Sequence, residues 1–141
     1  MDIDECIKFA VENPICFIAT MDGNQARVRG FQLWRADKTG LYYSTAAGKD
    51  IVKQLMANPS VEVCFFDPKS KEMKQIRITG NAQFVNDLEM KKQLIEARPF
   101  LKKAGITPES QALIIIRIVM STAVMWTFSE AMAPKKVISF T

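Results

Sequence analysis

The sequence predicts a mainly β protein: six or seven antiparallel strands that close, or nearly close, into a barrel with a few peripheral helices. A length of 141 residues suits one domain, so residues 1–141 are expected to form a single unit. Apolar, β-rich runs alternate with short turn sequences, and consecutive strands joined by short turns are antiparallel. A barrel is the economical way for so many strands to avoid long exposed edges.

A helix and a hairpin are predicted at the start of the chain. Apolar residues within 3–11 recur at the spacing of one helical face. Asp2 can cap the first turn of this helix, and Asn13-Pro14 ends it. Asp22-Gly23, between two apolar runs, is the strongest hairpin sequence in the chain. The strands that flank this turn are predicted at 15–21 and 25–35.

The later helices and strands are predicted from the same helical spacing of apolar residues and the same apolar, β-rich runs. A short helix at 51–56 ends at Asn58-Pro59, and Asn86 with Glu89 resembles a capping box that opens a helix running to about Pro99. Gly80, inside a β-rich run, indicates the bulge or bend that barrels need. The remaining strands are predicted at 41–45, 61–66, 75–85, 112–119 and 123–128, with a short one at 137–140.

The residue types present exclude several kinds of chemistry. The chain has no histidine, which rules out Cys–His and Ser–His–Asp catalytic sites and histidine-containing zinc sites. Its three cysteines include no CxxC pair, so neither a metal site nor a disulfide framework is predicted. Any redox chemistry would therefore come from a bound cofactor. The net charge of +4 suits an anionic ligand or a nucleic acid.

The chain is expected to be cytoplasmic, with no membrane segment. Cys16 and Cys64 lie inside apolar runs, as the buried, reduced thiols of cytosolic proteins do. The acidic N-terminus lacks the pattern of a signal peptide. The longest apolar run, at 112–116, is interrupted by Arg117 and is far too short to span a bilayer.

The segment 41–50 has the features of a phosphate cradle. A β-rich run leads to the hydroxyls of Ser44 and Thr45, then to small residues, and then to Lys49 at the start of a predicted helix. Small residues let backbone N–H groups approach an anion, and the helix N-terminus and Lys49 both add positive charge. Asp50 can cap this helix. The alternative is an ordinary strand-to-helix turn with a solvated lysine.

A second candidate is the strand that carries Arg27, Arg29 and Phe31. Strand alternation places these three residues on one face. Two guanidinium groups beside an aromatic ring could hold an anion and a planar ring, and Gly30 would let that ring approach the backbone. The alternative is a solvated strand face whose charges oppose aggregation.

The order of these motifs resembles the flavin-binding split-barrel family typified by pyridoxamine 5′-phosphate oxidase. The similarity extends over roughly residues 15–128, which is most of the chain. No single motif is as specific as a set of zinc ligands, but the motifs occur in the expected order on the expected elements. The matching segments are 18–23, 27–31, 40–45, 53–55 with 58–61, and 75–82.

The resemblance implies a six-stranded antiparallel split β-barrel that binds FMN between the two subunits of a homodimer. In the family, one strand lies along the flavin, a Tyr-Ser-Thr segment contacts the ring and the ribityl chain, and a basic residue at the next helix start holds the phosphate. A glutamine lies against the flavin, and a tryptophan is placed over the site. The implied cofactor-binding residues are Arg27, Arg29, Phe31, Gln32, Tyr43, Ser44, Thr45, Lys49, Gln75 and Trp126.

Departures from the family narrow the expected function. The true oxidase ends in a cluster of Trp, Arg and His that binds its pyridoxal substrate, whereas the segment 125–130 has no Arg and no His. We therefore expect no oxidation of pyridoxamine phosphate. Many members also have two basic residues before the helix, where this chain has Lys49 followed by Asp50. The chain is more similar to small, functionally diverse members, including the nitroimidazole-resistance flavoproteins.

The expected function is that of an FMN-dependent oxidoreductase that passes electrons from a reduced donor to a small acceptor. A flavin carrier or sensor without turnover is one alternative, and a deazaflavin or haem ligand in place of FMN is another. A barrel that binds single-stranded nucleic acid is a third, because Phe31, Trp34, Tyr42 and Tyr43 could stack on bases. Scattered lysines and nearly as many acidic as basic residues, 15 against 19, count against it.

Overall fold

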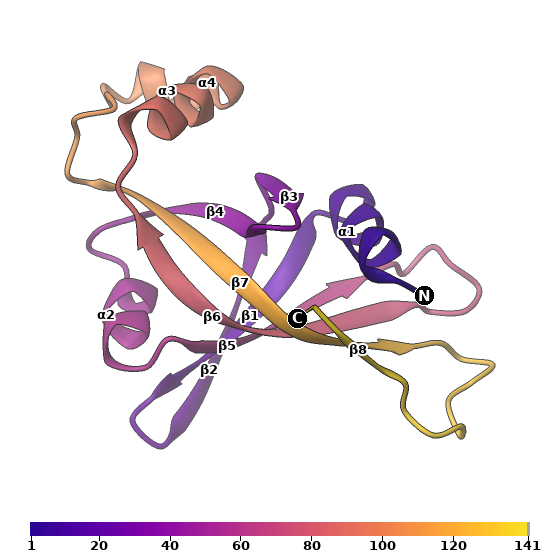
Figure 1. Ribbon diagram of the computed structural model, residues 1–141. Helices are drawn as coiled ribbons and strands as arrows, with labels where there is room; N and C mark the ends of the chain where they lie inside the picture. The colour runs from indigo at the N-terminus through magenta and orange to yellow at the C-terminus, as the bar shows by residue number, and fades with distance from the viewer. Residues whose placement is uncertain (141) are drawn as a thin grey trace.

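The structure is a computed structural model that describes residues 1–140. Across these residues it has four helices and eight strands (Figure 1). In chain order they are α1 (Ile3–Glu12), β1 (Ile15–Asp22), β2 (Gln25–Gln32), β3 (Arg35–Asp37), β4 (Gly40–Ala46), α2 (Asp50–Ala57), β5 (Ser60–Phe66), β6 (Gln75–Val85), α3 (Leu88–Ala97), α4 (Pro99–Lys103), β7 (Leu113–Trp126) and β8 (Val137–Ser139).

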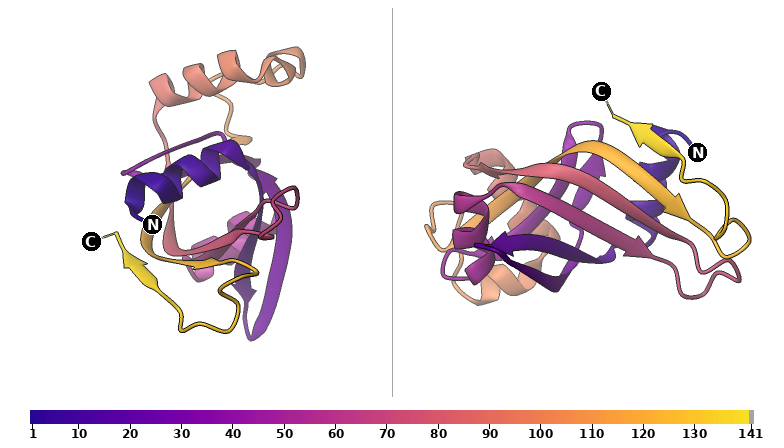
Figure 2. Two further views of the ribbon diagram at one scale, coloured as in Figure 1. Left: turned by 90° about the vertical axis from the view of Figure 1, so that its right-hand side faces the viewer. Right: turned by 90° about the horizontal axis from the view of Figure 1, so that it is seen from below.

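The strands form one antiparallel sheet in the order β2-β1-β5-β6-β7-β4-β3, and β8 pairs with β7. Figure 2 shows the sheet strongly curled, but β2 and β3 stand at its two ends and do not pair with each other. The prediction of a mainly β, antiparallel protein is confirmed. The prediction of a closed six-stranded barrel is wrong. The sheet is open, and its strands include β3, which is too short to show a clear period in the sequence, and β8, the short strand predicted at 137–140.

β7 also corrects the prediction of two strands at 112–119 and 123–128, because it is a single strand. The polar residues Ser121 and Thr122 interrupt its apolar sequence and suggested a break. The pairing between β6 and β7 shifts register at Thr79 and Gly80, so Ser121 is the extra residue of a bulge. Its hydroxyl donates to the Thr79 carbonyl over 2.9 Å. The predicted bulge at Gly80 is therefore confirmed.

The turn and capping chemistry matches the sequence closely but not completely. Asp2 and Glu5 form a capping box at the start of α1, and the β1–β2 hairpin turns at Gly23, whose φ of 60° favours glycine. At α3 the cap is Asp87, which accepts from the Met90 N–H, so the predicted cap at Asn86 was one residue early. A separate short helix, α4, follows α3, because Pro99 breaks the helical hydrogen bonding and then starts a new turn.

Apolar side chains form two cores. The larger core lies inside the curl of the sheet and includes Ile18, Phe65, Ile78 and Ile118, all at most 1% exposed. The smaller core joins α3 to the outer side of β4 and β7, and is built from Tyr42, Leu94, Ile95, Leu113 and Ile115. In Figure 1 the α3–α4 pair extends from the upper left of the sheet, and α2 lies at the lower left, near the turn between β1 and β2.

Candidate functional site

A groove of about 900 Å³ lies between the β1–β2 hairpin and the first turns of α2. This volume is typical of sites for small molecules and cofactors. β2 supplies one wall, α2 supplies another, and Thr45 near the end of β4 lies between them. The lining residues are Asp22, Arg27, Val28, Arg29, Gly30, Phe31, Thr45, Lys49, Asp50, Ile51, Lys53 and Gln54.

The groove is cationic, because four of its lining residues are basic and two are acidic. Arg27 is largely neutralised: its Nε lies 3.2 Å from Asp22 Oδ2, and both side chains are half exposed. Among residues 1–140, no carboxylate lies within 4 Å of Arg29, Lys49 or Lys53. The excess positive charge suits an anionic ligand.

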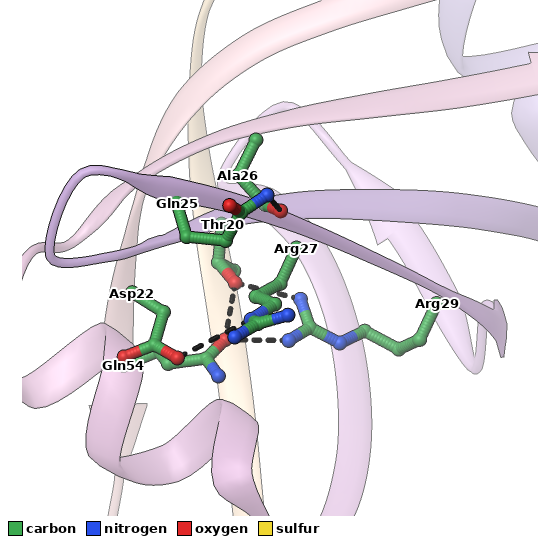
Figure 3. A network of polar contacts seen from close by, with 7 residues as sticks. All are labelled: Thr20, Asp22, Gln25, Ala26, Arg27, Arg29 and Gln54. Atoms are coloured by element: carbon green, nitrogen blue, oxygen red, sulfur yellow. Dashed lines mark hydrogen bonds and ion pairs between the residues drawn. The ribbon is translucent and has the colours of Figure 1, made fainter.

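Arg29 is held on the groove wall by three acceptors, of which Figure 3 shows Thr20 and Gln54. Its Nη1 donates to Thr20 Oγ1 over 2.7 Å and to the Ile18 carbonyl over 3.2 Å, and its Nη2 donates to Gln54 Oε1 over 2.5 Å. Desolvation by burial lowers the pKa of the Arg29 guanidinium, and the carboxylate of Asp50 opposes this change. The side chain therefore remains a fixed positive charge at neutral pH.

The N-terminus of α2 opens beside Lys49, as the segment 41–50 predicted. Lys49 is the N-cap residue, with an extended backbone and no side-chain capping bond, and Asp50 is the first helical residue. The expectation that Asp50 caps this helix is therefore wrong by one position. The first backbone N–H groups of a helix have no carbonyl partner within it. Together with Lys49 and Lys53 they form a positive end of the groove.

Apolar residues of β2 complete the lining of the groove. Phe31 is half-buried, and its ring packs edge-on against Tyr43 with centroids 5.7 Å apart. Val28, which is 69% exposed, and Gly30 also border the groove, but strand alternation places them on the opposite face of β2 from Arg29 and Phe31. A planar ring could lie against this wall while an attached anion reached the α2 end. The structure thus brings together Arg27, Arg29, Phe31, Thr45 and Lys49 among the predicted residues.

Tyr43, Ser44 and Gln32 do not line the groove. Tyr43 is fully buried, its hydroxyl lies 3.2 Å from Cys16 Sγ, and burial raises the pKa of both, that of Cys16 to about 11. Ser44 faces the opposite side of β4, where Arg98 Nη1 donates to its Oγ over 3.3 Å. The Gln32 carbonyl accepts from Arg98 Nη2 over 3.4 Å.

These placements also weaken the nucleic-acid alternative. Tyr42 and Tyr43, two of the rings that could have stacked on bases, are 2% and 0% exposed. Neither offers a face to a nucleic acid.

Gln75 and Trp126 lie on a different surface, the outer face of β1, β5, β6 and β7. They pair across β6 and β7 and line a shallow apolar hollow with Phe17, Cys64, Phe66, Met73 and Phe128. We call this set the outer apolar face. Several of its side chains are strongly exposed, including Phe17 at 49% and Phe128 at 69%. Monomeric soluble proteins rarely expose large contiguous apolar areas.

Sequence reasoning missed three residues at the site, Thr20, Lys53 and Gln54, and one outside the groove, Arg98. Lys53 could have been found, because it follows Lys49 by four residues, which is the spacing of neighbours on one helix face. Thr20 and Gln54 lie in the segments 18–23 and 53–55 that resemble the family, but their role was not predicted, since it depends on the packing of α2 against β1. Arg98 joins the end of α3 to β2 and β4, a contact between distant segments.

Comparisons with known proteins place the chain in a family. The model of the pyridoxamine 5′-phosphate oxidase family matches residues 3–136. No curated protein matches the chain. Among residues 1–140, none of the helices has the length and apolar character needed to cross a membrane.

Solved structures have the same fold at low identity. A NimC/NimA family protein from Clostridium acetobutylicum is 24% identical, with a TM-score of 0.78 over 97% of this chain and 91% of its own. General stress protein 26 from Bacillus anthracis is 18% identical, with a TM-score of 0.73 over 89% and 95%. An FAD-binding protein from Mesorhizobium loti is 22% identical, with a TM-score of 0.67 over 90% and 95%.

Proposed function

Because the chain belongs to the pyridoxamine 5′-phosphate oxidase family, we propose that its cationic groove binds FMN and that the protein is a flavin-dependent oxidoreductase. The proposal is carried by one observation: Arg29, Phe31, Lys49 and the start of α2 line a single groove. The donor set fits the cofactor, because the cations at the α2 end suit a phosphate and the aromatic side chain of Phe31 on β2 suits a planar ring.

Each part of the groove has a distinct task in this proposal. Lys49, Lys53 and the first N–H groups of α2 hold the phosphate, and Thr45 offers a hydroxyl along the connecting chain. Phe31 contacts the ring, and Arg29 places a positive charge at its edge. Bound FMN would supply hydride and electron transfer. No histidine is needed, because the protein side chains bind and orient rather than transfer protons.

The charge of Arg29 gives a specific prediction about the cofactor. A cation near the ring stabilises the anionic reduced flavin more than the neutral oxidised flavin. Arg29→Ala should therefore lower the midpoint potential of bound FMN by some tens of millivolts, at roughly 30 mV for each 1.4 kcal/mol of lost preference. Spectroscopic redox titration measures this shift.

The neighbouring arginine provides the control. Arg27 is paired with Asp22, so Arg27→Ala should change the midpoint potential of bound FMN much less. For the same reason, Arg27 should not replace the lost positive charge in Arg29→Ala. An unchanged potential in both Arg29→Ala and the double variant would remove Arg29 from the site.

We also propose that the protein is a homodimer with FMN at the subunit interface. The outer apolar face supports this, because it exposes aromatic side chains on one side of the sheet. It borders the groove: Val28 lines the groove and is exposed, and a Cβ added at Gly30 would lie 3.8 Å from the Phe17 ring. A second copy packed on this face could bring Gln75 and Trp126 of the partner subunit to the open side of the groove.

Phe17→Asp tests the dimer. A carboxylate at the centre of a buried apolar interface would be strongly destabilising, so the variant should be a monomer by light scattering, whereas the parent has twice the chain mass. FMN affinity should fall with it. Val11→Asp is the matched control, since Val11 is also half exposed but lies on α1, away from the face. A parent protein that is monomeric with FMN bound would contradict the proposal.

A further inference from the structure

Arg29 and Arg27 are two residues apart on β2, yet their surroundings differ in kind. Arg27 meets a carboxylate, that of Asp22, at 3.2 Å. Arg29 meets only neutral oxygens: a threonine hydroxyl, a backbone carbonyl and a glutamine amide. The nearby carboxylate, Asp50, affects the pKa of Arg29 but makes no ion pair with it within 4 Å among the described residues.

The neutral acceptors form a connected, buried unit. Thr20 is 2% exposed and Gln54 is 9% exposed, so both are shielded from water. The Thr20 hydroxyl donates to Gln54 Oε1 over 2.6 Å, which leaves the lone pairs of Thr20 free to accept from Arg29. Gln54 Oε1 thus accepts two hydrogen bonds, one from the hydroxyl and one from the guanidinium. Figure 3 shows the three side chains converging from β1, β2 and α2.

These hydrogen bonds also determine which N–H donors of Arg29 remain available to a ligand. A guanidinium has five N–H donors in a planar fork. Bonds to Thr20 and Ile18 occupy the two hydrogens of Nη1, and the bond to Gln54 occupies one hydrogen of Nη2. The Nε hydrogen and the second Nη2 hydrogen lie side by side on one edge, and among residues 1–140 the protein offers them no acceptor. That edge can donate to a pair of acceptor atoms on a ligand.

We propose that Gln54, supported by Thr20, is a positioning residue that fixes the Arg29 guanidinium without neutralising it. This inference rests on the proposed flavin site and assigns a task to a residue outside the predicted set. A carboxylate at position 54 would hold the guanidinium equally well but would cancel its charge. An amide holds it and leaves the full positive charge for the ligand. The glutamine therefore makes the site selective for the reduced, anionic form of the cofactor.

Two variants of nearly the same shape as glutamine separate the effect of holding the Arg29 guanidinium in place from the effect of the charge at position 54. Gln54→Met removes the acceptor, and Gln54→Glu keeps the acceptor and adds a charge. Met56→Glu is the control for added charge on α2, because Met56 is 73% exposed. Thermal unfolding of each variant establishes that it is folded, and Thr20→Val serves as a second test of the anchor should Gln54→Met fail to fold.

The first measurement needs no flavin. In nuclear magnetic resonance spectra of the parent, the Nη hydrogens of Arg29 should give separate signals, because three hydrogen bonds stop their rotation. The signals are assigned by their loss in Arg29→Lys. Gln54→Met should collapse them into an averaged signal, and Gln54→Glu should retain them. Separate signals in both Gln54→Met and Thr20→Val would overturn the positioning role.

The second measurement uses the flavin-loaded protein. Gln54→Glu should lower the ratio of affinities for reduced and oxidised FMN by roughly tenfold, which is about 30 mV for a two-electron couple. Met56→Glu should leave the ratio at the parent value. If Gln54→Glu has the same ratio of affinities for reduced and oxidised FMN as the parent, the inference is overturned while the proposed function stands. If the parent binds no flavin, the proposed function fails, and the magnetic resonance result decides the role of Gln54 alone.

Discussion

Lys49→Ala should weaken FMN binding by roughly tenfold to a hundredfold, since a charge-assisted hydrogen bond contributes about 1.5–3 kcal/mol. Lys49 is exposed at the N-cap of α2, so its removal changes the charge at the phosphate end without disturbing the core. Fluorescence titration with FMN measures the change. Lys53 lies one turn further along the same groove, so Lys49→Ala with Lys53→Ala should lose more than either single variant.

Riboflavin separates a phosphate contact from a general effect on the groove. It lacks the phosphate, so Lys49→Ala and the parent should bind it about equally. Lys8→Ala is the matched protein control, because Lys8 is an exposed lysine on α1 that pairs with Glu12. Parent-like FMN affinity in Lys49→Ala would mean that the phosphate lies elsewhere.

Gly80→Ala should cost about 3 kcal/mol of stability, the upper end of the usual range for overpacking. A Cβ at Gly80 would overlap the Val119 carbonyl oxygen and lie 2.8 Å from Ile118 Cγ2, so the backbone of β7 would have to shift. The bulge at Ser121 lies beside this close approach of β6 and β7. The midpoint of thermal unfolding should fall by about 10 °C, measured by circular dichroism.

Gly48→Ala provides the comparison for that loss. A Cβ at Gly48 has no heavy atom within 4 Å, and its φ is outside the left-handed region. Its unfolding midpoint should stay within a few degrees of the parent. Equal stability of the two alanine variants would show that the approach of β6 to β7 at the bulge is not required for the fold.

Local chemistry made part of this fold predictable from the sequence. The Asp2 cap, the turn at Gly23 and the bulge at Gly80 each depend on residues adjacent in the chain and on what their backbone permits. The openness of the sheet was not predictable, because it depends on which strands pair over long distances. β3 has only three residues, too few to show alternation, whereas β8 is the short strand predicted at 137–140.

In the candidate site, too, the features that depend on local sequence were predictable and those that depend on contacts between distant segments were not. Lys49 follows from a helix start after small residues, and Arg29 from alternation along one strand. Whether each charge is free or paired depends on contacts between segments, such as Asp22 with Arg27 and Gln54 with Arg29. The family resemblance named Tyr43 among the cofactor-binding residues, but the direction of its side chain is set by the curl of the sheet, which turns it into the core beside Cys16.

The most direct test of the account is titration of the purified protein with FMN and, in parallel, with riboflavin and a single-stranded oligonucleotide. We expect FMN to bind with one molecule per chain, with the absorbance bands of bound flavin, and more tightly than riboflavin by the contribution of the phosphate contact. The oligonucleotide should not compete. Failure to bind FMN, or equal affinity for FMN and riboflavin, would contradict the assignment of the groove between β2 and α2.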